Sequence, residues 1–366
     1  MYDIKILDSI EHSLIWADLE SDVQYHVFAL TLTNKGTVLA FSEGRFKKWT
    51  ADAEAPHHIT MKRSEDNGKT WSENIILLDA FKNPCFDTEN LYEGSTKPGH
   101  CYTNPVPVVD ENTGRITLVY ADNYENAYSK VYTISSIDDG VTWTEPVEIT
   151  DVFADDPHKR TLHLPGPGHG IQLKKGKYAG RLVVEVWHRQ TIELPVEDRC
   201  YGISVIYSDD GGLSWKSSEY IHMMDRMNEA RIAEGSDGNV IMNSRTFLDC
   251  RLKVLSADGG HTWSKPTKWE SIGNSCMCDS GFLTFNHGDK TYMAISHPEG
   301  EKRNNTTILI SDDDGKTWIS RTQIYDKGRQ GYTDLVYMKN GKLGVLFSME
   351  DLSIHFTSFD LDIFLK

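Results

Sequence analysis

Short apolar segments separated by turn residues recur along the whole chain. Residues 27–32 and 37–41 are strand-like and flank Asn-Lys-Gly at 34–36, a hairpin signal. Similar pairs of apolar segments surround the polar turns at 110–114, 236–238, 286–289 and 340–341. Amphipathic helical periodicity of useful length is absent from the sequence. The pattern therefore predicts an all-β fold.

A second pattern, Ser-x-Asp-x-Gly-x-Thr/Ser-Trp, occurs five times, at residues 64–71, 136–143, 208–215, 256–263 and 311–318. We call each copy a box. Ser and Asp side chains bond nearby backbone N–H groups and Gly supplies a positive φ, so the box makes a tight turn. We expect its Trp to pack against its own sheet and pin the turn.

A unit repeated at this spacing is typical of propellers and solenoids. Five boxes in 366 residues predict six blades, one of them without a box. The sequence thus predicts a single six-bladed β-propeller domain over residues 1–366. We expect the terminal strands to close the ring together, since closure removes exposed sheet edges.

The amino-acid composition limits the classes of partner that we expect for this chain. Hydrophobic residues make up 39% of the chain and aromatic residues 10%, enough for a packed core. The net charge of −16 disfavours nucleic acid and anionic membranes as partners. The sequence contains no run of 18 apolar residues and no evident leader, so a cytoplasmic location is expected, with a secreted form left open.

No metal or cofactor is expected. Six cysteines are too few for a disulfide scaffold in a chain of this length. Cys-Met-Cys at 276–278 lacks the second ligand pair that zinc needs. The acidic box at 311–318 lacks the first ligand and the late Glu of a calcium loop.

Segments outside the boxes resemble the sialidase (neuraminidase) superfamily, in the order found in that family. They are Ala-Phe-Ser-Glu-Gly-Arg at 40–45, Lys-Arg-Ser at 62–64, Asn-Pro-Val-Pro-Val-Val-Asp at 104–110, Gly-Pro-Gly-His-Gly-Ile-Gln at 166–172, Asn-Glu at 228–229, Met-Asn-Ser-Arg at 242–245, Ser-His-Pro at 296–298 with Arg303, Gly-Tyr-Thr-Asp-Leu at 331–335, and Glu350. The resemblance covers nearly the whole chain. It implies a propeller glycoside hydrolase that is exo-acting and retaining, with a glycan or small sugar as its substrate.

The resemblance also implies roles for individual residues. Tyr332 would be the nucleophile and Glu229 its base, because a phenol with a pKa near 10 needs a base within hydrogen-bond reach. A neutral Tyr is not repelled by the carboxylate that a sialic acid carries at its anomeric carbon. The acid that protonates the leaving oxygen would be Asp52, with Glu54 as the rival in the same loop.

Fixed cations would bind the acidic sugar. The resemblance assigns this role to Arg45, Arg245 and Arg303, because a guanidinium binds a carboxylate bidentately and does not deprotonate. Glu350 corresponds to a late Glu that steadies the family's first Arg. His169 follows the Gly-rich turn and is a further candidate for contact with the substrate.

One residue departs from the family pattern. His26 stands where the family has the first Arg, in a segment that reads Tyr-His-Val-Phe at 25–28. Imidazole is shorter than guanidinium, lacks its fork and is only partly charged at neutral pH. The alternatives are therefore a different acidic or neutral sugar, lyase chemistry with His26 or His169 as acid/base, and a carbohydrate-binding propeller without turnover. The oligomeric state stays open.

Overall fold

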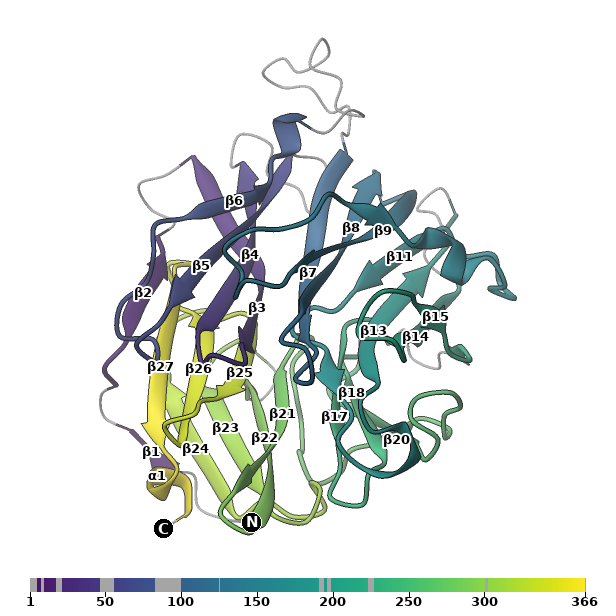
Figure 1. The fold of residues 1–366 in the computed structure, drawn as a ribbon. Helices are drawn as coiled ribbons and strands as arrows, with labels where there is room; N and C mark the ends of the chain where they lie inside the picture. The colour runs from purple at the N-terminus through teal and green to yellow at the C-terminus, as the bar shows by residue number, and fades with distance from the viewer. Residues whose placement is uncertain are drawn as a thin grey trace.

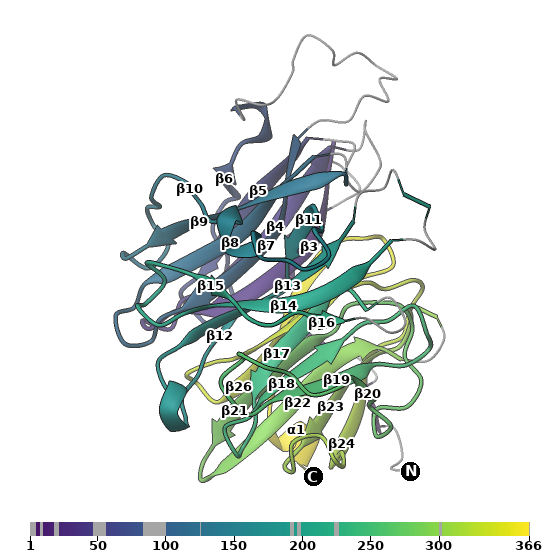
Figure 2. The same cartoon turned by 90° about the vertical axis from the view of Figure 1, so that its right-hand side faces the viewer.

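A computed structural model describes residues 5–7, 10–17, 22–46, 56–82, 100–124, 126–190, 194–195, 199–222, 227–299 and 302–365. In these residues six β-sheets are arranged around a common axis (Figures 1 and 2). The predicted six-bladed all-β propeller is confirmed. The candidate loop acids Asp52 and Glu54 lie outside the described residues.

The first three blades take their strands from residues 23–222. The first is β3 (Val23–Leu32), β4 (Val38–Phe46), β5 (His57–Ser64) and β6 (Ile75–Leu78). The second is β7 (His100–Val109), β8 (Ile116–Tyr124), β9 (Tyr128–Ser136) and β10 (Val147–Glu148). The third is β11 (Leu162–Pro165), β12 (Ile171–Gln172), β13 (Leu182–Arg189), β14 (Tyr201–Ser208), β15 (Lys216–Ser217) and β16 (Ile221–His222).

The other three blades follow in order. The fourth is β17 (Ala230–Glu234), β18 (Val240–Ser244), β19 (Leu252–Ser256) and β20 (Thr267–Lys268). The fifth is β21 (Gly281–His287), β22 (Lys290–Pro298), β23 (Thr306–Ser311) and β24 (Ser320–Tyr325). The sixth is β25 (Thr333–Tyr337), β26 (Lys342–Ser348) and β27 (Ile354–Asp360), completed by β2 (Ser13–Trp16).

The described helices are single short turns: η1 (Ala80–Lys82), η3 (Thr150–Phe153), η4 (Gly176–Tyr178) and α1 (Asp362–Leu365). No helix in the described ranges has the length and apolar character required to cross a membrane.

The ring closes through its ends, as predicted. β2, near the N-terminus, pairs antiparallel with β27, near the C-terminus, with Ser13 opposite Phe356. β1 (Lys5–Ile6) adds a parallel strand to β24 of the fifth blade. β27 and β24 each thereby gain a partner strand on a side that would otherwise be an open edge.

The boxes join the third and fourth strands of a blade. In the first box the Ser64 hydroxyl donates to Asp66 and accepts from the Gly68 N–H at 2.7 Å, and Asp66 also accepts from the Thr70 N–H at 2.9 Å. The sixth blade has no box because its fourth strand, β2, comes from the other end of the chain. Ring closure thus explains why six blades carry five boxes.

The expectation that each box Trp packs against its own sheet is wrong in part. The ring of Trp71, from the first blade, packs edge-on against Phe356 of the sixth, with centroids 5.3 Å apart. Trp143, from the second blade, packs the same way against Phe41 of the first. A Cβ on Gly68, at φ +85°, would overlap the Phe356 ring. The Trp and Gly of a box therefore also pack one blade against its neighbour.

Candidate active site

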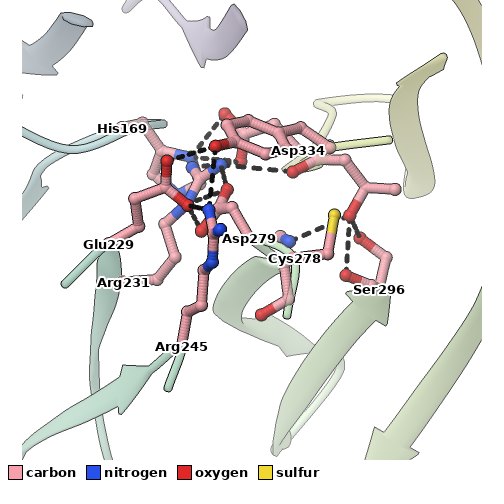
Figure 3. A network of polar contacts seen from close by, with 12 residues as sticks. His169, Glu229, Arg231, Arg245, Cys278, Asp279, Ser296 and Asp334 are labelled. Atoms are coloured by element: carbon pink, nitrogen blue, oxygen red, sulfur yellow. Dashed lines mark hydrogen bonds and ion pairs between the residues drawn. The ribbon is translucent and has the colours of Figure 1, made fainter. Parts of the chain in front are cut away.

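The starts of two axial strands bring a phenol and a carboxylate together. Glu229 directly precedes β17, and Tyr332 directly precedes β25. The Tyr332 hydroxyl donates to one oxygen of Glu229. Arg245, just after β18, donates from Nη1 to the other oxygen of Glu229 and lies 3.2 Å from the Tyr332 hydroxyl (Figure 3). Three predicted site residues thus share one hydrogen-bonded cluster.

The environment of Tyr332 keeps its phenol protonated. The residue is 5% exposed. Burial, together with the negative charge of Glu229, raises the pKa of Tyr332 well above its ordinary value, and Arg245 only partly opposes this. An oxygen held neutral in this way needs a base before it can attack, and Glu229 already accepts its hydrogen bond.

Two more predicted residues flank the phenol ring. The His26 ring lies 4.9 Å from that of Tyr332, centroid to centroid. The guanidinium carbon of Arg303 lies 5.9 Å from the Tyr332 centroid. Arg303 is oriented by the Met277 carbonyl, which accepts from its Nη2 at 2.8 Å. His26 therefore lies beside the candidate nucleophile.

Arg45 lies on the adjoining strand β4 and is fixed by a buried acid. Its Nε and Nη2 both lie 2.7 Å from Glu43 Oε2. Glu43 is fully buried and also accepts from the Asn104 N–H at 2.7 Å. Burial raises the pKa of Glu43 even though Arg45 favours its charge. Glu43 is directly opposite His26 in the β3–β4 register.

Two predicted substrate contacts have other partners in the structure. Glu350 is exposed and accepts a hydrogen bond from Tyr325. His169 is buried, and its Nδ1 lies 3.0 Å from Asp334 Oδ1. Its ring also borders a cavity of about 650 Å³ that is lined by the later residues of β3, β17, β21 and β25. This cavity lies at the opposite ends of those strands from Tyr332.

A second buried ion pair lies directly behind the first cluster. Arg231 donates from Nη1 to Asp334 at 3.1 Å and from Nε to Asp279 at 3.0 Å. Arg231 is two residues beyond Glu229, and Asp334 is two residues beyond Tyr332, so each pair shares one face of its strand. A side chain at Gly168, at φ +92°, would overlap the Arg231 guanidinium. The Gly-rich turn is therefore required for Arg231 to fit.

Sequence reasoning missed this network, although strand alternation signals it. Side chains at i and i+2 point the same way, so an Arg and an Asp following the candidate base and nucleophile at that spacing also face the axis. The position of Asp279 carries no comparable signal. Asp279 and Arg231 become neighbours only where the fourth, fifth and sixth blades pack together.

The acids of this network differ in protonation. His169 and Arg231 hold the pKa of Asp334 below its ordinary value despite its burial. Burial raises the pKa of Asp279 even beside Arg231. It raises that of Glu185 well above the ordinary value, although the charge of Arg231 opposes this rise. The structure thus favours an ionised Asp334 and a protonated Glu185.

Among the residues that the structure describes, no group of three or more His, Cys, Asp and Glu is placed to hold a metal ion.

The fold and site define a six-bladed propeller with a tyrosine–glutamate pair in a cationic setting. The sequence model of the BNR repeat-like domain matches residues 36–345, so the chain belongs to this family. It is 28% identical to a sialidase of Micromonospora viridifaciens over 92% of this chain and 51% of that protein. It is also 28% identical to a sialidase of Bacteroides fragilis, over 95% of this chain and 64% of that protein.

The chain thus spans about half to two-thirds of the length of these two relatives. Among solved structures, the Hadza microbial sialidase Hz136 superposes with a TM-score of 0.76 at 24% identity, over 93% of this chain and 66% of that one. This similarity supports the propeller fold.

Proposed function

We propose that this chain is an exo-acting, retaining glycoside hydrolase that releases a terminal sialic acid or a related acidic sugar. The observation that carries the proposal is the hydrogen bond from the Tyr332 hydroxyl to the Glu229 carboxylate. A protein that only binds sugar has no need of a buried phenol paired with a base. The sialidase names of relatives that align with most of this chain support the same substrate class.

In the proposed reaction, the Tyr332 oxygen attacks the anomeric carbon while Glu229 takes the phenolic proton. A loop acid protonates the departing oxygen, and we assign this role to Asp52, with Glu54 as the alternative. Water then releases the sugar from Tyr332. Two displacements at one carbon give net retention of configuration.

Arg245 has a double role in this proposal. Its Nη1 bonds to both Glu229 and Tyr332. A substrate carboxylate would compete for the same guanidinium, with Arg303 and Arg45 as further cations. Arg245 also favours the developing phenolate, because it opposes the upward shift in the pKa of Tyr332.

A second candidate function is the same reaction on a different sugar. The observation in its favour is the His26 ring beside Tyr332, where a further guanidinium would otherwise bind a carboxylate. One fewer charge-assisted contact weakens binding by about 1.5–3 kcal/mol. A sugar with a hydroxyl or amide at this point would suit the imidazole better.

The test is hydrolysis of a panel of terminal glycosides, with sialosides, uronic acid glycosides and neutral glycosides compared. Proton NMR of the first product would follow the configuration at the anomeric carbon. Retained configuration with a sialoside supports the first proposal, and selective cleavage of another glycoside supports the second. No turnover of any glycoside, or inversion, would contradict both.

A further inference from the structure

A tight turn carrying two thiols adjoins the Tyr332 cluster. The Cys278 N–H donates to the Cys276 carbonyl at 2.8 Å, which closes a three-residue turn. Neither cysteine is in a disulfide. Their exposed fractions are 8% for Cys276 and 1% for Cys278. Both belong to the same apolar cluster as Tyr332, and Cys278 appears beside the site in Figure 3.

Two guanidinium groups hold the turn by its carbonyls. Arg303 donates to the Met277 carbonyl at 2.8 Å, and Arg251 donates from Nη1 to the Cys278 carbonyl at 2.8 Å. Arg303 is also one of the candidate substrate-binding residues. The backbone between the two thiols therefore helps to orient a side chain of the proposed site.

The two sulfur atoms have opposite tendencies to ionise. The hydrogen bond from Cys278, with the nearby charges of Arg303, Arg251 and Arg245, lowers the pKa of Cys276 to about 7 although burial opposes this. Burial raises the pKa of Cys278 well above its ordinary value. A thiolate is the nucleophilic form of cysteine, so the pair combines an attacking sulfur with a neighbouring thiol.

We propose that Cys276 and Cys278 form a redox modification site, at which a hydroperoxide oxidises Cys276 and Cys278 resolves the product as a disulfide. The Cys276 sulfur attacks one peroxide oxygen, so that an S–O bond forms, the O–O bond breaks and hydroxide or alkoxide leaves. The Cys278 sulfur then attacks the Cys276 sulfur of the sulfenic acid. An S–S bond forms, the S–O bond breaks, and the Cys278 proton leaves with the oxygen as water.

The geometry accommodates this chemistry. A three-residue turn brings its first and third α-carbons into the range that a disulfide spans. A disulfide requires a specific dihedral angle about its S–S bond. Its formation therefore changes the backbone conformation of the turn and moves the Met277 carbonyl.

This last step connects the modification to the proposed hydrolase function and rests on it. Movement of the Met277 carbonyl removes the acceptor that orients Arg303. We expect the oxidised protein to bind an acidic substrate more weakly. The loss of one oriented charge-assisted contact corresponds to a rise in KM of about tenfold or more.

The first test is chemical and needs no activity. The full chain is treated with hydrogen peroxide, digested without reductant and analysed by mass spectrometry. We expect a peptide spanning residues 276–278 that has lost two hydrogens and regains them with dithiothreitol. In Cys278→Ser, dimedone should label Cys276 as the trapped sulfenic acid. Cys200→Ser is the control at a thiol on another blade, and it should form the same disulfide.

Absence of that disulfide in the peroxide-treated unmodified chain would overturn the modification site. So would dimedone labelling of Cys278 in Cys276→Ser, since it would make the other sulfur the nucleophile. The second test compares KM for the preferred glycoside before and after oxidation. A disulfide without a reversible rise in KM would overturn the connection to Arg303. Failure of the hydrolase proposal itself would appear as absent turnover in the reduced protein and leave the mass result intact.

Discussion

The Arg231 guanidinium and the Asp334 carboxylate lie 3.1 Å apart, directly behind the Glu229–Tyr332 hydrogen bond. Arg231 and Asp334 lie on β17 and β25, each two residues beyond Glu229 and Tyr332, which directly precede these strands. Arg231 also bonds to Asp279, which precedes β21 of the intervening blade. One buried guanidinium thus connects three blades where the candidate base and nucleophile must meet.

Arg231→Met should therefore destabilise the protein. It leaves Asp279 and Asp334 buried without their cation, and breaking a buried ion pair costs about 3–5 kcal/mol. Urea unfolding at neutral pH measures the change. Lys130→Met is the control, because Lys130 pairs with Glu148 at the surface and its loss should change the free energy of unfolding by less than about 1 kcal/mol. Equal effects of the two substitutions would contradict the role assigned to Arg231.

Tyr332→Phe should lower kcat by about a thousandfold or more without loss of fold, because the attacking oxygen disappears while the ring remains. Glu229→Gln should lower kcat by about 10²–10⁴-fold, since an amide does not accept the phenolic proton. Steady-state kinetics on the preferred glycoside measures both. Tyr337→Phe is a matched control on the same strand, where the hydroxyl contacts His287. Near-normal turnover by Tyr332→Phe would rule out the covalent Tyr mechanism.

Much of the fold could be predicted because its signals are local. The apolar segments and the turns at each box are set by residues close together in the sequence, and the structure confirms both. Local signals do not predict the site, because Glu229 and Tyr332 are 103 residues apart in the sequence. Their pairing followed from the resemblance to a family, because the spacing alone does not identify partners on different blades.

The remaining features depend on contacts between blades. Trp71 packs on Phe356 only because the last blade closes against the first. The network of Arg231 and Asp279 likewise forms only when three blades converge. A sequence pattern predicts which face of a strand is buried. It does not predict which strand of another blade packs against that face. Asp52 stays a prediction as the acid.

Buried histidines should make stability fall in acid. Burial lowers the pKa of His163 to about 4, that of His297 to about 3 and that of His188 well below its ordinary value. The unfolded chain protonates them near pH 6.5. Between about pH 6.5 and 4 the unfolded state therefore binds more protons, so the free energy of unfolding decreases as pH falls.

Each such histidine contributes a slope of up to about 1.4 kcal/mol per pH unit in that window. His297→Asn should remove one contribution to this slope, because an amide does not titrate in this pH range. The amide can still donate to the Pro298 carbonyl that His297 contacts at 2.8 Å, so the local hydrogen bond is kept. Urea unfolding between pH 7.5 and 4.5 measures the slope. His287→Asn, at an exposed position, should leave it unchanged. A slope that His297→Asn does not alter would contradict the assignment.

His26→Arg tests the predicted departure of this chain from the sialidase sequence pattern. If the pocket beside Tyr332 is otherwise built for a sialic acid, a guanidinium there should restore a charge-assisted contact and lower KM for a sialoside about tenfold or more. Activity on a sugar that uses the imidazole should fall in the same variant. His287→Arg adds the same charge at an exposed position and should change neither value. Efficient cleavage of sialosides by the unmodified protein, with no gain from His26→Arg, would show that His26 does not limit sialic acid binding.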